Sequence, residues 1–133
     1  MNTIVAEVKE IKNVDNLNIV KFYFAGTTLS MMSLELNENI KVGAKVKLIT
    51  KPTHVAIAKD FSGEVSYSNQ LDAEIIHVEN GELLSSIKIR IWETTLESII
   101  TKDSSERMNL HAGDAVTAFI KANELSIVEV LDD

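Results

Sequence analysis

The stretch Asn2-Thr3-Ile4-Val5-Ala6-Glu7-Val8 returns sixty-seven positions later as Asn69-Gln70-Leu71-Asp72-Ala73-Glu74-Ile75, with the asparagine, the alanine and the glutamate unchanged. The same offset relates Asn13 to Asn80 and Thr27-Thr28-Leu29 to Thr94-Thr95-Leu96. Beyond this point the offset is seventy, and it relates Gly43-Ala44-Lys45-Val46 and Lys51 to Gly113-Asp114-Ala115-Val116 and Lys121. An ordered series with one small shift indicates a tandem duplication. The three extra residues of the second copy fall in the segment that corresponds to Ser30–Gly43.

Apolar residues alternate with polar ones in both copies, which is the period of half-buried β-strands. Ile4, Ala6 and Val8 show the pattern in the first copy, and Ile87, Ile89 and Ile91 show it in the second. Further strands are expected at 42–49 and 115–120, and the segments 54–58 and 125–130 are expected to close each unit. One stretch, 101–110, begins with helix-start residues and is expected to form one or two helical turns.

These elements predict an all-β protein of two tandem OB-like five-stranded barrels, each with at most a short helix. The first repeat is assigned to residues 1–60 and the second to residues 67–133. A short polar linker is expected between them, over residues 59–67.

Composition removes several classes of function. The chain has 133 residues, no cysteine and a formal charge of −7, and all of the excess acid lies after Asp60, because residues 1–60 carry a small net positive charge. Disulfides, thiolate metal sites and thiol nucleophiles are therefore excluded. An acidic chain with 5% aromatic residues is poorly suited to nucleic acid. No stretch is long and apolar enough to span a membrane, and no secretory signal is visible, so a cytoplasmic protein is expected.

Neither a metal site nor a catalytic site is predicted. The three histidines, His54, His77 and His111, have no partners at ligand spacing, and the five glycines form no phosphate loop. The one suggestive group is Thr101, Ser104 and Lys121. Two hydroxyls at a helix start would suit a tetrahedral dianion if the strand before Lys121 folds back beside them. The alternative is that Thr101 only caps the helix, Ser104 bonds locally and Lys121 is a surface charge.

The second copy resembles the Mop, or TOBE-type, domain of molbindins. The resemblance lies in Ile100-Thr101-Lys102-Asp103-Ser104, Leu110-His111-Ala112-Gly113-Asp114 and Ala118-Phe119-Ile120-Lys121-Ala122. The first copy resembles it more weakly, through Lys41-Val42-Gly43 and Ile49-Thr50-Lys51-Pro52-Thr53-His54-Val55. Together the similarity spans nearly the whole chain, which then looks like a tandem di-Mop protein.

The resemblance implies that molybdate or tungstate is bound between neighbouring domains. One side would consist of Thr101, Ser104, Lys121 and the backbone of Ala122. The other corresponds to a Ser-Ala-Arg-Asn pattern, which here reads Ser66-Tyr67-Ser68-Asn69, so that Ser68 stands where the family has arginine. A positive charge is missing there, and a hydroxyl cannot imitate the planar guanidinium.

The first copy departs further from the family pattern. Residues 31–36 stand where the threonine and serine are expected, and only Lys51 survives as a secondary candidate. We therefore expect a non-catalytic cytoplasmic protein that stores or buffers molybdate or tungstate, and a homo-oligomer, with a trimer favoured. Molybdopterin as the bound form remains an alternative. A second hypothesis is a ligand-free oligomerising or regulatory module associated with molybdate transport or regulation.

Overall fold

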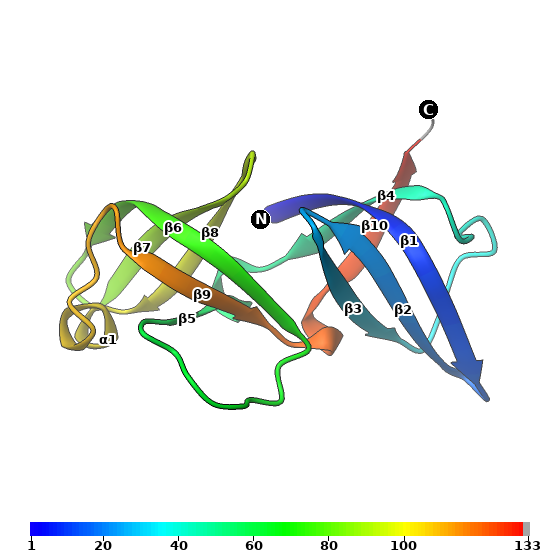
Figure 1. The fold of residues 1–133 in the computed structure, drawn as a ribbon, viewed down its shortest axis with the longest axis horizontal. Helices are drawn as coiled ribbons and strands as arrows, with labels where there is room; N and C mark the ends of the chain where they lie inside the picture. The colour runs from blue at the N-terminus through cyan, green and yellow to red at the C-terminus, as the bar shows by residue number, and fades with distance from the viewer. Residues whose placement is uncertain (132–133) are drawn as a thin grey trace.

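The computed structural model describes residues 1–131 and shows two curled antiparallel sheets of five strands side by side (Figure 1). The strands of the first repeat are β1 (Asn2–Val14), β2 (Leu17–Phe24), β3 (Thr27–Ser33), β4 (Lys45–Thr50) and β5 (Ala56–Ala58), with a 3₁₀ turn η1 (Pro52–His54) before β5. Those of the second are β6 (Asn69–Asn80), β7 (Leu84–Ile91), β8 (Thr94–Thr101), β9 (Ala115–Ile120) and β10 (Ser126–Leu131), with the helix α1 (Lys102–Arg107) after β8 and the 3₁₀ turn η2 (Ala122–Glu124) before β10. The all-β, OB-like tandem fold is thus confirmed.

The two sequence offsets also relate the secondary-structure elements of the two repeats. β2 and β7 have the same bounds when shifted by sixty-seven, and β4, β9, η1 and η2 correspond at seventy. Both long first strands shift register at equivalent points, after Val8 and after Ile75, and such bulges increase strand twist. The extra residues of the second copy contribute to α1, which has no counterpart among the first repeat's elements.

The predicted alternation of buried and exposed residues is present. Ile4, Ala6 and Val8 face the core from β1, while Glu7 and Lys9 face outward. Ile87, Ile89 and Ile91 do the same from β7. The inward-facing side chains of both curled sheets belong to one cluster of buried hydrophobic residues.

An equivalent glycine turn closes onto the first strand of each repeat. Gly43, at φ +92°, donates its N–H to the Val8 carbonyl over 2.8 Å, and Gly113, at φ +95°, donates to the Ile75 carbonyl over 2.7 Å. Glycine adopts positive φ without the steric cost of a Cβ atom. These turns start β4 and β9 beside the bulges.

The closing strands are exchanged between the repeats. The strand order is β10-β4-β1-β2-β3 in one sheet and β5-β9-β6-β7-β8 in the other. In Figure 1, β10 lies beside β4 in the sheet of the first repeat, and β5 lies with the second. The expectation that residues 54–58 and 125–130 close their own units is therefore wrong, because each completes the opposite sheet.

Two equivalent asparagines join the sheets. The Asn69 side chain accepts the Ser30 N–H over 2.7 Å and donates to the Ser30 carbonyl over 3.0 Å. Asn2 makes the matching pair of bonds with the N–H and carbonyl of Glu97, at 2.8 and 2.7 Å. Both asparagines are buried, where a paired polar group is needed to avoid a desolvation cost.

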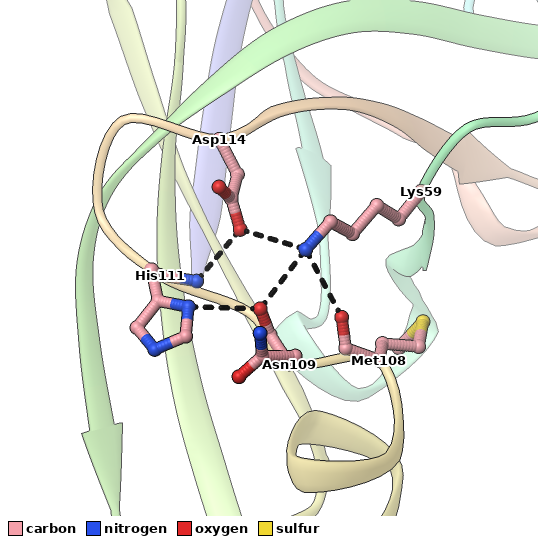
Figure 2. A network of polar contacts seen from close by, with 5 residues as sticks. All are labelled: Lys59, Met108, Asn109, His111 and Asp114. Atoms are coloured by element: carbon pink, nitrogen blue, oxygen red, sulfur yellow. Dashed lines mark hydrogen bonds and ion pairs between the residues drawn. The ribbon is translucent and has the colours of Figure 1, made fainter.

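Lys59 fastens the exchanged strand β5 to the second sheet (Figure 2). Its ammonium donates to the carbonyls of Met108 and Asn109, at 3.2 and 3.0 Å, and lies 3.3 Å from the Asp114 carboxylate. The His111 backbone N–H donates to that carboxylate over 2.8 Å. The residue after β5 is thus tied to the end of α1 and to the turn before β9.

The same network affects how stability depends on pH. The His111 N–H, and secondarily the ammonium of Lys59, lower the pKa of Asp114 below its usual value, while partial burial opposes them. A lowered folded-state pKa contributes stability that is present above the unfolded pKa, about 3.9, and is lost as the pH falls through the folded pKa. Asp114→Asn should therefore weaken the acid dependence of the unfolding free energy below about pH 4.

Denaturant unfolding of Asp114→Asn and of the intact chain between about pH 2 and 6 measures this dependence. Asp72→Asn, at an exposed carboxyl on β6, is the matched control. If Asp114→Asn and the intact chain lose stability with the same slope, Asp114 does not contribute to it.

Candidate functional site

The structure brings Thr101 and Ser104 together at the junction of β8 and α1. Thr101 is the N-cap of α1, and its hydroxyl accepts the Ser104 N–H over 3.1 Å. The two side-chain oxygens are 3.0 Å apart. Thr101 therefore caps the helix, which is one of the two roles that the sequence suggests for it. A single hydrogen bond between the two hydroxyls uses only one of their two protons, so one O–H remains to donate to a ligand.

Arg107 joins this pair, and the sequence analysis missed it. Its Nη2 donates to the Ser104 hydroxyl over 3.1 Å. Ser104 and Arg107 are three residues apart on α1 and so share a helix face. This spacing within a predicted helical stretch is the signal that could have identified Arg107. We call Thr101, Ser104 and Arg107 the α1 cluster.

Lys121 and Ala122 lie elsewhere. The end of α1 is tied through Lys59 to Asp114, just before β9, and β9 then runs toward the middle of the molecule (Figure 1). At about 3.3 Å per residue, the six residues of β9 carry the chain roughly 20 Å before Lys121. The expectation that this strand returns Lys121 to Thr101 and Ser104 is wrong within one chain.

Lys121 and Ala122 instead neighbour the other predicted residues, Ser66, Ser68 and Asn69. Asn69 pairs with Ile120 in the β6–β9 ladder, and its side chain donates to the Ile120 carbonyl over 3.0 Å. Tyr67 stacks on Phe119, with ring centroids 5.2 Å apart, while Ser66 and Ser68 on either side of it are exposed. We call Ser66, Ser68, Asn69, Lys121 and Ala122 the β9 cluster.

The Asn69 side chain is fully committed to structure. Its amide N–H groups go to the carbonyls of Ser30 and Ile120, and its oxygen accepts the Ser30 N–H. The residue is 0% exposed. An amide group has two N–H donors, so none is left for an anion. Any contact of Asn69 with a ligand would have to come from its backbone.

Lys51 lines a cavity of about 150 Å³ between η1 and η2, together with Met1, Ile49, Thr50, His54, Asn123, Glu124 and Ser126. His54 and Glu124 occupy equivalent positions of the two repeats, and their side chains are 3.3 Å apart. The carboxylate of Glu124 in this cavity opposes the binding of a dianion beside Lys51. Two hydroxyl residues, Thr50 and Ser126, also line it, but among residues 1–131 they are not hydrogen-bonded to each other as Thr101 and Ser104 are.

Within residues 1–131, no three histidine, cysteine or acidic side chains cluster closely enough to hold a metal ion. None of the helices in the same range is long and apolar enough to cross a membrane.

Residues 66–127 match the model of the TOBE domain. The solved structure of a molybdate-binding protein from Sporomusa ovata is 34% identical to this chain, covering 53% of this chain and 100% of that one, with a TM-score of 0.46. The structure of the cytoplasmic molybdate-binding protein ModG with molybdate bound is 23% identical, covers 95% of this chain and 94% of that one, and has a TM-score of 0.89. No curated protein sequence matches the chain.

The likeness to ModG extends over both repeats and shows that the fold of nearly the whole chain is shared. Residues 66–127 therefore belong to the TOBE-domain family, and the chain as a whole has the fold of ModG.

Proposed function

We propose that this protein binds molybdate or tungstate as a cytoplasmic, non-catalytic store or buffer of the oxyanion. The observation that carries the proposal is the Thr101–Ser104 hydroxyl pair, on a fold shared with a protein described as binding molybdate. A tetrahedral dianion accepts many hydrogen bonds, and hydroxyl and ammonium donors suit it. Each charge-assisted bond contributes roughly 1.5–3 kcal/mol.

Two copies of the chain are needed to complete this site. The α1 cluster and the β9 cluster are separated along β9, so a dianion cannot touch both within one chain. The β9 cluster of one copy would lie against the α1 cluster of the next, which makes binding depend on assembly. A homo-oligomer follows from this arrangement, and the family resemblance favours a trimer.

We expect one such site for each chain. The first repeat has no counterpart of α1, and so no hydroxyl pair at a helix start, and Lys51 shares its cavity with Glu124. The first repeat then serves mainly as scaffold, since its β4 carries the closing strand β10 of the second.

Isothermal titration with molybdate, tungstate, sulfate and phosphate, on protein of measured oligomeric state, tests the proposal. Thr101→Ala and Lys121→Ala should each weaken molybdate binding about tenfold to a hundredfold, because the first removes the hydroxyl that is bonded to Ser104 and the second removes an ammonium donor. Thr95→Ala on β8 and Lys88→Ala on β7 are matched controls at exposed positions of the same strand or sheet. An intact chain that takes up none of the four anions would refute the proposal, and unchanged affinity in both variants would refute the residues chosen.

A second candidate function is a ligand-free oligomerising or regulatory module associated with molybdate transport or regulation. Ser68 in place of the family's arginine favours it, because the β9 cluster has lost a cation. Such a module would be purified without molybdenum or tungsten and would show no thermal shift with either oxyanion. Elemental analysis of freshly purified protein distinguishes the two functions and also reveals any metal held with a pterin.

A further inference from the structure

We infer that Arg107 replaces the arginine missing at position 68, so that the α1 cluster supplies the guanidinium for the oxyanion. This inference rests on the proposed function and assigns one more ligand-binding residue to the same site. It also makes the composition of the site particular to this chain, with its strongest cation on α1 and not on the segment before β6.

The position of Arg107 is the first support. Its Nη2 lies 3.1 Å from the Ser104 hydroxyl, which is itself 3.0 Å from the Thr101 hydroxyl. An anion held by that hydroxyl pair is therefore within reach of the guanidinium. Arginine has five N–H donors in a planar fork, and this bond uses one of them. The others can bind two oxygens of one tetrahedral ion.

The state of its charge is the second support. The chain has two arginines, and Arg90 is engaged by Glu74 at 2.7 Å. Within residues 1–131, Arg107 forms no ion pair, although Asp103 and Glu106 lie on the same short helix. A cation left without a carboxylate partner beside two hydroxyls is available to an anion.

The charge balance of α1 is the third support. Lys102 and Arg107 offset Asp103 and Glu106 within this helix. Without Arg107 the segment would carry a net negative charge at the place where a dianion must approach, and like charges repel over such short distances. The second repeat is also the acidic part of the chain, so a local cation matters more there.

The groove next to the cluster is the fourth support. Ser104 and Arg107 line an open groove of about 620 Å³ between α1 and the segment after β5, and Lys59 and Asp60 are among the other residues that line it. The cation of Lys59 on the opposite wall is already engaged by Asp114 at 3.3 Å. Arg107 is thus the cation in this groove that has no acidic partner among residues 1–131.

Molybdate titration of three single variants and one double variant tests the inference. Arg107→Ala should weaken binding about tenfold to a hundredfold, the loss expected for one charge-assisted contact. Arg107→Lys should recover part of the affinity, because an ammonium keeps the charge but not the fork. Arg90→Ala, which removes the other arginine, should leave affinity unchanged. Thermal melts of each variant show whether the fold is retained.

Rescue is the sharpest result. If Ser68 stands opposite the α1 cluster of a neighbouring copy, Ser68→Arg in the Arg107→Ala background should restore affinity to within a few-fold of the intact chain. A residue that only supported the helix could not be replaced from position 68.

The possible failures are distinct. If the intact chain binds molybdate and Thr101→Ala weakens binding while Arg107→Ala does not, the inference about Arg107 is wrong and the proposed function stands. If Arg107→Ala weakens binding but neither Arg107→Lys nor Ser68→Arg recovers any affinity, Arg107 acts through structure and the inference is also wrong. An intact chain that binds no oxyanion overturns both.

Discussion

Residues 1–60, produced without the rest of the chain, are expected to show no cooperative thermal unfolding as a monomer. This fragment lacks β10, which pairs with β4 along its length from Ser126 to Leu131. It also lacks the buried Leu125, while its own β5 would lose its partner β9. A unit of about sixty residues is marginal even when complete, because it buries only about 60% of the surface exposed in its unfolded chain. Circular dichroism melts and size-exclusion chromatography measure the result.

A nicked chain is the matched control. Cleavage at a protease site inserted near Gly63, in the exposed linker, leaves every strand in place. The two pieces should then migrate as one particle and melt together, since β5 and β10 hold each to the other. A concentration-dependent homodimer of residues 1–60 is also consistent, because β5 of one copy could replace β10 in another. A monomeric fragment that melts cooperatively near the temperature of the intact chain would contradict the strand exchange.

Asn69→Ala is expected to lower the free energy of unfolding by about 3 kcal/mol or more. The substitution leaves the N–H and carbonyl of Ser30 and the carbonyl of Ile120 without the partner they have now. Each unsatisfied buried group costs about 1–3 kcal/mol. Urea denaturation followed by circular dichroism gives the change directly.

Asn2→Ala and Gln70→Ala calibrate this prediction. The Asn2 side chain makes two such bonds, to the backbone of Glu97, so Asn2→Ala should lower the free energy of unfolding by less than Asn69→Ala does. Gln70 is exposed, with one bond to the Tyr67 carbonyl at 3.0 Å, and its removal should change stability by a few tenths of a kcal/mol. Equal losses at Asn69 and Gln70 would mean that the asparagine bridge does not hold the sheets together.

The sequence predicted the elements of this fold well. The alternation in β1 and β7, the two offsets and the helical turn after Thr101 each reflect local chemistry, which is written in consecutive residues. A period of two specifies a strand with one buried face, and α1 begins at the residue whose hydroxyl caps it. These features depend little on which strand lies next to which.

The pairing of strands that are far apart in the sequence cannot be predicted from such local patterns. β5 and β10 have the same apolar pattern whether they close their own sheet or the opposite one. The distance between Lys121 and Thr101 was misjudged for the same reason. Asn69 shows a related limit. Its match to Asn2 is visible in the sequence and the resemblance implies a ligand-binding residue, while in the structure its side chain bridges the two sheets.

The exchange of β5 and β10 also bears on how the two repeats can diverge. A duplicated unit that folds independently can decay once its binding residues are gone. Here the first repeat supplies β5 to the sheet that carries α1, so a destabilising change in either half harms both. Selection on the half that carries α1 would therefore also preserve the core of the other half, even where the sequences of the two repeats diverge.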